Sequence, residues 1–475
     1  MTGEPVNGGT PAITGDDHQF PPRRRMNLAR LSSTPRQARS GTPAHPRVIA
    51  MRLRRLLLVS IVLGGAVITG CSPASPASPR STTASPPGLS ACAWPIEDNY
   101  LTSNSGLPDS GAWYWAQPFT IHQDTEVVLS GVYPDARYAS FTVYSSSETP
   151  FTSNGVGSSL ADFQIAPDPG STNPWRQPAP PGGRFTLTLR PRVSPGQVNV
   201  LPLAPAGVTG GVGYIEYRVY LPASRDGAQL ALPRVTIENG GSSRQLRACT
   251  SHVMPIPPPS RPTTTTPATT PTSASAGTSR PAPLQFYRPA FRTYFPNPET
   301  AYLIAYMTPP TASDVVVVTG TAPTSPPGAH PSIWPTTKDQ VRYWSMCVNI
   351  GVGTAPVVVN HLPGGKTDLG CRADDATKLG VGGTYAYVIG TEAQRTVIEH
   401  VAGVTFLPLS LSQSAALYFL AMRYTLANPT FNSAPQDITQ TGNATAAAQT
   451  MGKHYPHAQV CSLSLLSAKG VSACE

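Results

Sequence analysis

Short runs of alternating apolar and polar residues recur along most of the chain. They include FTLTLR at 185–190, RVTIE at 234–238, PVVVN at 356–360 and TYAYVIG at 384–390. Gly, Pro, Asn and Asp separate these runs at short intervals, which is typical of antiparallel sheets. The sequence therefore predicts a mainly β protein of antiparallel, sandwich-like domains with few short helices.

Two segments require a choice between helix and strand. Residues 444–453, ATAAAQTMGK, are rich in alanine and predict a short helix. Residues 412–426, SQSAALYFLAMRYTL, suit either a helix or a buried strand. We predict a strand there, because an internal repeat calls for one.

The repeat relates two parts of the chain. Residues 127–143 read VVLSGVYPDARYASFTV, while residues 316–348 open on VVVTGTAP and close on RYWSMCV. Each copy predicts a hairpin whose second strand opens R-Y-x-S, and the second copy carries 16 extra residues in its loop. Further on, IEYRVYLP at 215–222 parallels LAMRYTLANP at 420–429. Chance similarity is the alternative, but three features in the same order favour duplication and two related domains.

An apolar run, LLLVSIVLGGAVITGC, occupies residues 56–71 behind three arginines at 52, 54 and 55. It is shorter than the roughly 20 apolar residues that span a bilayer, and charged and apolar regions in this order are typical of an export signal. The small residues before Cys71 resemble a bacterial lipobox. We therefore predict a signal peptide at 51–70 and a lipidated Cys71, with an uncleaved signal anchor as the alternative. Residues 1–50 predict a disordered extension, and translation is expected to start at Met51.

Two low-complexity stretches divide the remaining chain. Residues 71–91 form a Pro/Ser/Ala tether behind the lipidated cysteine, and residues 254–283 form a Pro/Thr-rich linker that predicts a semi-rigid spacer. The predicted domains are accordingly a first β domain at 92–253 and a second at 284–475. Each is long enough to bury a core.

The net charge changes once the signal is set aside. The whole chain carries +9, but residues 1–70 hold ten of the 34 basic and three of the 25 acidic residues. The remainder has 24 basic and 22 acidic residues, a net charge of +2. Nucleic-acid binding requires clustered positive charge, so we exclude nucleic acid as a partner.

The chain has seven cysteines, of which six remain if Cys71 carries lipid. An even set in an exported chain is typical of disulfides. Six cysteines allow 15 pairings, and pairing of neighbours is the simplest. This predicts Cys92 with Cys249, Cys347 with Cys371, and Cys461 with Cys474. The alternative of a zinc site is disfavoured, because no two cysteines show C-x-x-C spacing.

Five motifs occur in order along the chain: RYASFTVY, APDPGSTNPW at 166–175, YRVYLP followed by LPRVT, RYWSMC, and a closing HYPHAQVC. Together they resemble a family of uncharacterised exported proteins of actinobacteria. The resemblance covers most of residues 95–465. It implies a β-rich envelope protein and brings no assigned catalytic residue.

Catalytic and metal-binding patterns are weak. No G-x-S-x-G pentapeptide occurs, and Ser140 and Ser345 lie within predicted strands. His454 and His457 flank Pro456 and are interpreted as surface residues rather than a metal pair. The acidic sets are Asp162 with Asp168, and Asp374 with Asp375; each suits a turn better than a calcium site. We expect no cofactor and no metal.

The repeated R-Y-x-S motifs hold the candidate binding residues Arg137 and Tyr138, then Arg342, Tyr343 and Trp344. In one interpretation the arginines pair with carboxylates and serve the repeated fold, while the aromatic rings fill cores. In the other they line a cleft that binds an anionic headgroup or a sugar acid. The structural interpretation is preferred, because repeated residues usually serve the repeated fold.

Taken together, the sequence predicts a lipid-anchored protein on the extracytoplasmic face of the cell membrane. We expect it to be a binding or interaction module for an envelope glycan, lipid or protein. A hydrolase acting on envelope glycans or lipids, and a structural spacer, are the alternative functions. The sequence leaves its oligomeric state open.

Overall fold

The computed structural model describes residues 92–146, 148–227, 229–252, 284–290, 295–351, 353–412 and 417–474. All of them belong to one unit, Thr82–Glu475. The predicted extension, signal peptide, tether and Pro/Thr-rich linker lie outside the described residues. Within the described ranges no helix has the length and apolar character needed to cross a membrane.

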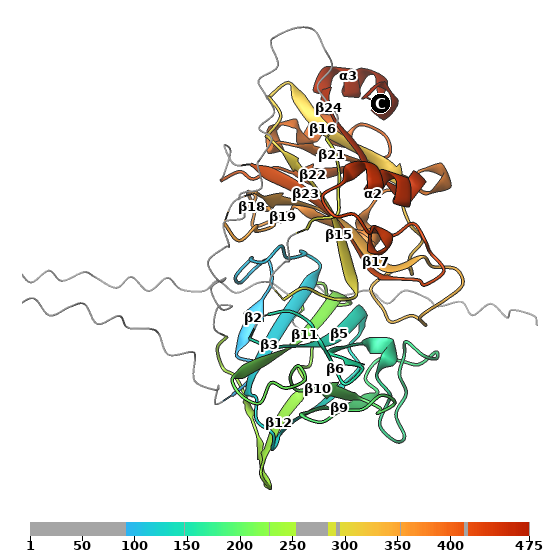
Figure 1. The fold of residues 1–475 in the computed structure, drawn as a ribbon. Helices are drawn as coiled ribbons and strands as arrows, with labels where there is room; N and C mark the ends of the chain where they lie inside the picture. The colour runs from blue at the N-terminus through green and yellow to red at the C-terminus, as the bar shows by residue number, and fades with distance from the viewer. Residues whose placement is uncertain are drawn as a thin grey trace, which may run out of the picture. The chain divides into compact units, whose positions relative to one another are not determined.

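The protein is mainly β, as predicted, and its strands fall into two halves on either side of the linker (Figure 1). The strands of the first half are β1 Cys92–Ala93, β2 Ile96–Asp98, β3 Ala112–Thr120, β4 Thr125–Val132, β5 Ala136–Tyr144, β6 Thr152–Ser153, β7 Val156–Gly157, β8 Ser159–Ala161, β9 Arg184–Arg190, β10 Val200–Pro202, β11 Val212–Pro222, β12 Arg234–Asn239, β13 Ser242–Gln245 and β14 Arg247–Ala248. Those of the second half are β15 Thr300–Met307, β16 Asp314–Thr321, β17 Val341–Ile350, β18 Val359–His361, β19 Thr367–Leu369, β20 Cys371–Ala373, β21 Thr384–Gly390, β22 Val404–Pro408, β23 Tyr418–Ala427 and β24 His457–Ser462. The α-helices are α1 Arg395–Glu399, α2 Ala444–Met451 and α3 Leu463–Lys469.

The first half contains two five-stranded sheets. We call β2-β3-β11-β5-β8 its seam sheet and β10-β9-β4-β12-β13 its outer sheet. Strand β9 shows how the sequence builds them: Phe185, Leu187 and Leu189 are buried, while the residues between them are more exposed. This alternation packs one face of the outer sheet against the seam sheet, and the two faces enclose a common core.

The second half repeats this arrangement. Its seam sheet, β15-β23-β17-β20, follows the order β3-β11-β5-β8, and its outer sheet, β22-β21-β16-β24, follows β10-β9-β4-β12. Even the parallel edge pair recurs, since β10 lies parallel to β9 and β22 parallel to β21. The same order and the same exceptional pairing in both halves confirm the predicted two related sandwiches.

The predicted hairpins are wrong in one respect. Strands β4 and β5 do not pair with each other but lie in opposite sheets, and so do β16 and β17. The turn after Gly131 carries the chain across the sandwich, with Tyr133 buried at 2% exposure in the core. Sequence order alone does not determine which strands pair, because pairing partners here are distant along the chain.

Local predictions elsewhere are largely confirmed. Helix α2 covers most of the predicted 444–453 segment and is capped by Asn443, whose side chain accepts a hydrogen bond from the Ala446 amide. Strand β23 occupies 418–427, as the repeat predicted. The run at 356–360 is shorter as a strand, because β18 begins only at Val359.

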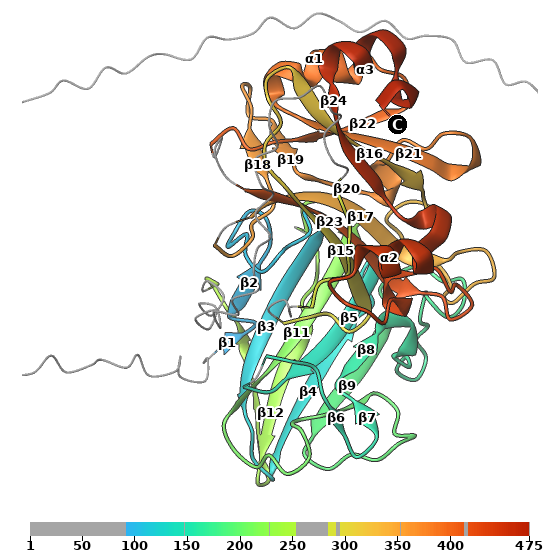
Figure 2. The ribbon, with the colours of Figure 1, turned by 45° about the horizontal axis from the view of Figure 1, so that its top comes forward.

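The second half differs from the first on the outward face of its outer sheet. Helices α1 and α3 lie close to each other at that sheet (Figure 2) and bury Ile398 and Leu466 with Val315 and Val317 of β16. In the first half the equivalent positions of β4, Glu126 and Val128, are only partly buried. The outward face of the first half is therefore the more open of the two.

All three predicted disulfides are present. Cys92 is bonded to Cys249, Cys347 to Cys371, and Cys461 to Cys474. They close segments of very different length, with sequence separations of 157, 24 and 13 residues. The first joins the two ends of the first half, and the last holds α3 and the C-terminal turn against β24.

Candidate functional site

The repeated arginines lie at the contact between the two seam sheets, which we call the seam. Arg137 and Arg342 are both 0% exposed. Arg137 Nη1 donates to Asp374 Oδ2 at 2.7 Å, and Arg342 Nη2 donates to Asp162 Oδ1 at 3.3 Å. Each arginine therefore pairs with an aspartate of the other half. The seam is reciprocal, as in an interface between two identical subunits.

The main chain strengthens this reciprocity. Arg137 Nη1 donates to the carbonyl of Arg342 at 3.2 Å, and Arg342 Nη1 donates to the carbonyl of Arg137 at 3.0 Å. The Gly328 carbonyl accepts a further bond from Arg137 Nε at 2.6 Å. Gly328 lies in the 16-residue insertion of the second half, so this loop fastens the second half onto the first.

The repeated tyrosines form a second reciprocal pair. Tyr343 donates to Asp109 Oδ2 at 2.7 Å, and the Asn297 side chain donates to the Tyr138 hydroxyl at 3.1 Å. Asp109 and Asn297 both stand three residues before the first long strand of their half. Trp344 points away from the seam, into the core of the second half, where its ring centroid lies 5.7 Å from that of Tyr385.

Two further arginines of the repeat, on β11 and β23, are also buried. Arg423 Nη1 lies 3.3 Å from Asp109 Oδ2, and Arg218 Nη2 lies 2.7 Å from Glu216 Oε2. Arg423 also approaches the Leu107 carbonyl at 3.4 Å. These contacts agree with the structural interpretation of the repeated arginines. Each guanidinium group is paired with carboxylate or carbonyl oxygens of the protein itself.

Burial shifts the ionisation of the seam carboxyl groups. Desolvation raises the pKa of Asp162 to about 6, although Arg342 and the amides of Ala139 and Phe163 favour its charged form. Desolvation likewise raises the pKa of Glu216 to about 7 against the attraction of Arg218. It raises the pKa of Asp374 as well. The folded state therefore binds protons more readily than free carboxyl groups do.

A pH dependence follows from these shifts. Carboxyl groups in the unfolded chain titrate near pH 4, whereas Asp162 and Glu216 titrate near 6 and 7 when folded. The folded state binds more protons in that window, so we expect the free energy of unfolding to fall as the pH rises from 5 to 7.5. Burial lowers the pKa of His454, which by itself would make the free energy of unfolding rise with pH. This single histidine opposes several carboxyl groups, so we expect the net change to be a fall.

Denaturant unfolding across this pH range would measure the effect. Glu216→Gln should make the unfolding free energy depend less on pH. Glu238→Gln should leave that dependence unchanged, because Glu238 is partly exposed near the end of β12. An unfolding free energy that rises steadily over the same range would contradict the assignment.

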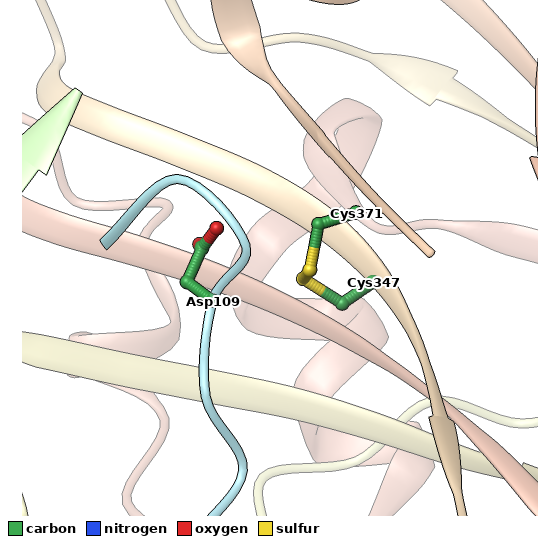
Figure 3. A group of neighbouring side chains, drawn as sticks. All are labelled: Asp109, Cys347 and Cys371. Carbon is green, nitrogen blue, oxygen red and sulfur yellow. A yellow bond between two sulfur atoms is a disulfide. The ribbon is translucent and has the colours of Figure 1, made fainter. Parts of the chain in front are cut away.

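One cluster has the geometry of a metal site but not its chemistry. Asp109, Cys347 and Cys371 place a carboxylate oxygen and two sulfurs within 4.8 Å of one another (Figure 3). The sulfurs are joined in a disulfide, which leaves no thiolate to ligate a cation. The carboxylate of Asp109 instead accepts bonds from Tyr343 and, at 2.7 Å, from Ser345.

The other candidate residues do not converge on a catalytic arrangement. Ser140 and Ser345 are both buried in seam strands, and the partner of Ser345 is a carboxylate, not a histidine. His454 is buried, contrary to the surface interpretation, and its Nδ1 lies 2.9 Å from the Thr321 carbonyl. His457 is exposed at the start of β24. Among the residues that the structure describes, no serine, histidine and carboxylate meet as a triad.

Asp162 and Asp374 lie in turns, as predicted, because each begins the short 3-10 turn that follows the last strand of its seam sheet, at β8 and β20. Sequence reasoning missed their second role, which is to pair with the seam arginines. A signal was available, because the two aspartates occupy equivalent places in the repeat. Of the other two acidic residues, Asp168 accepts a bond from Thr186 of its own half at 3.2 Å, whereas Asp375 pairs with Arg225 of the other half.

Comparison with known proteins adds little to this geometry. No family model matches the chain, and no curated protein does. A solved structure of an uncharacterised protein from Burkholderia cenocepacia is 12% identical with a TM-score of 0.41, covering 76% of this chain and 79% of that chain. A solved structure from Vibrio parahaemolyticus is 9% identical with a TM-score of 0.36, covering 75% and 90%. Likenesses this distant carry no argument about function.

Proposed function

We propose that this protein is exported, anchored by lipid on Cys71, and acts at the cell envelope as a binding or interaction module. One observation carries the proposal: the six cysteines other than Cys71 are all bonded in pairs. Disulfides form and persist in oxidising compartments outside the cytoplasm. The single remaining cysteine is the one that directly follows the export signal, where a lipoprotein carries its acyl chains.

The chemistry of the seam supports a binding role rather than catalysis. Its guanidinium and carboxyl groups are buried against one another, so they are not free to meet a substrate. Their effect is to hold two related sandwiches as one body. Such a body offers a fixed surface outside the membrane, as a binding module requires.

The tether suits this role. Residues 71–91 are dominated by Pro, Ser and Ala, a composition with little to bury. We propose that this tether lets the folded unit contact envelope components at some distance from the membrane.

Replacing Cys71 with Ala tests the anchor. Cells of the native host fed labelled palmitate should incorporate label into the wild-type protein and into a Ser72→Ala control, but not into Cys71→Ala. A wild-type protein that takes up no label, stays membrane-bound and keeps residues 51–70 would instead identify an uncleaved signal anchor and refute lipidation.

A further inference from the structure

A hollow of about 390 Å³ lies on the outward face of the first outer sheet, away from the seam. Strands β4, β9 and β12 contribute to it, together with the loop that contains Asp168 and the segment at Leu232. Arg184 of β9 and Arg234 of β12 both line it and are both exposed. The hollow is therefore bordered by two cationic side chains that solvent can reach.

The sheet register places these arginines on the same face. Arg184 is paired with Val132 of β4, and Arg234 is paired with Ser130 on the other side of that strand. Residues two apart on a strand point to the same face. By standard sheet spacings their Cα atoms are about 12 Å apart, a span that two long arginine side chains can close around one anion.

Neither guanidinium group is engaged by the described part of the protein. Arg190, on the same face of β9, has its ion pair with Glu126 at 3.2 Å. For Arg184 and Arg234 the described residues provide no ion pair and no side-chain hydrogen bond. An unpaired guanidinium with free donors in a hollow is suited to a carboxylate or phosphate group.

The second half gives an internal comparison. Its register pairs Thr321 with Thr384 and Thr319 with His457, at the positions equivalent to Val132 with Arg184 and Ser130 with Arg234. The duplicated fold therefore forms without either arginine. This contrasts with the seam arginines, which occur in both halves and serve the fold.

The other polar groups that line the hollow indicate which chemical groups the ligand carries besides its anionic group. Ser130 and Thr186 present hydroxyl groups on the same face, and the carboxylate of Asp168 lies beside them. A carboxylate repels an anion but accepts hydrogen bonds from sugar hydroxyls. The combination suits a ligand with one anionic group and several hydroxyls.

We propose that this hollow binds an anionic sugar, with its carboxylate or phosphate between Arg184 and Arg234 and its hydroxyls on Ser130, Thr186 and Asp168. The inference rests on the proposed binding function and supplies its ligand class. The same chemistry occurs in a glycan and in a sugar-bearing lipid headgroup.

Calorimetric titration of the mature chain carrying Cys71→Ala tests the proposal, because that change removes the lipid from the experiment. The probes are glucose 1-phosphate, glucuronate, inorganic phosphate and glucose. We expect both anionic sugars to bind more tightly than phosphate or glucose. Arg184→Gln and Arg234→Gln should each weaken binding about tenfold, as expected for losing one charge-assisted contact.

The matched control is the double variant Arg192→Gln/Arg244→Gln, which removes two exposed charges outside the hollow. It should bind as the wild type does. Equal losses in this control and in Arg184→Gln/Arg234→Gln would show general electrostatics and overturn the site, and so would absence of binding to every probe.

Sedimentation with vesicles of phosphatidylcholine, with and without phosphatidylinositol, distinguishes a lipid headgroup from a glycan as the ligand. Arginine-dependent sedimentation with phosphatidylinositol vesicles would assign a headgroup, whereas binding of soluble sugars alone would assign a glycan. None of these outcomes depends on acylation of Cys71, so failure here leaves the anchor proposal to its own test.

Discussion

Arg342→Met is expected to lower the free energy of unfolding by about 3 to 5 kcal/mol, the range for breaking a buried ion pair from one side. Arg342 is fully buried and donates both to Asp162 and to the carbonyl of Arg137. Removing it leaves the Asp162 carboxylate without a cation inside the seam. Denaturant unfolding monitored by tryptophan fluorescence would measure the change.

A double-mutant cycle isolates the pair. Adding Asp162→Asn to Arg342→Met removes the uncompensated charge and should recover part of the loss, because the amide oxygen can still accept a main-chain bond. Arg190→Met is the matched surface control; it breaks a pair whose side chains are 42% and 35% exposed and should change stability by less than about 1 kcal/mol. Equal effects at both sites would show that the seam ion pairs do not hold the halves together.

Loss of the Cys92–Cys249 disulfide is expected to be the most damaging of the cysteine changes. It closes 157 residues, and the loop-entropy argument gives a stabilisation of about 5 kcal/mol. For the 13-residue separation of Cys461–Cys474 the same argument gives about 3 kcal/mol. Paired Cys→Ser variants differ only in the bond removed, so each is a control for the other.

Midpoints of guanidinium unfolding would rank the two variants. The C92S/C249S protein should unfold at the lower denaturant concentration. The reverse order would mean that local packing around α3, rather than chain entropy, determines what each bond contributes.

Much of the fold follows from local pattern. The alternation of β9 and the alanine-rich α2 were each predictable, because each depends on residues close in sequence. The three disulfides follow the simplest pairing, in which each cysteine bonds to the next one along the chain, at separations from 13 to 157 residues. The repeat also predicted a strand at β23 where composition was ambiguous. The crossing of the chain from β4 to β5 was not predictable, since β9 and β12, which flank β4, and β11, which pairs along the whole of β5, all lie far along the chain.

The sites were harder to predict than the strands. The R-Y-x-S motif identified Arg137 and Arg342, but their partners Asp162 and Asp374 come from the opposite half and become neighbours only when the sandwiches pack. Arg184 and Arg234 carry no motif. They meet only because β9 and β12 flank β4 in a particular register, which sequence order does not reveal.

We propose that the chain is exported and matures at Cys71. The most direct measurement is the intact mass of the protein purified from membranes of its native host. We predict a chain that begins at Cys71, carries acyl groups there, and lacks one hydrogen at each of the other six cysteines. A mass for an unacylated chain that retains residues 51–70 and keeps its cysteines reduced would contradict the account.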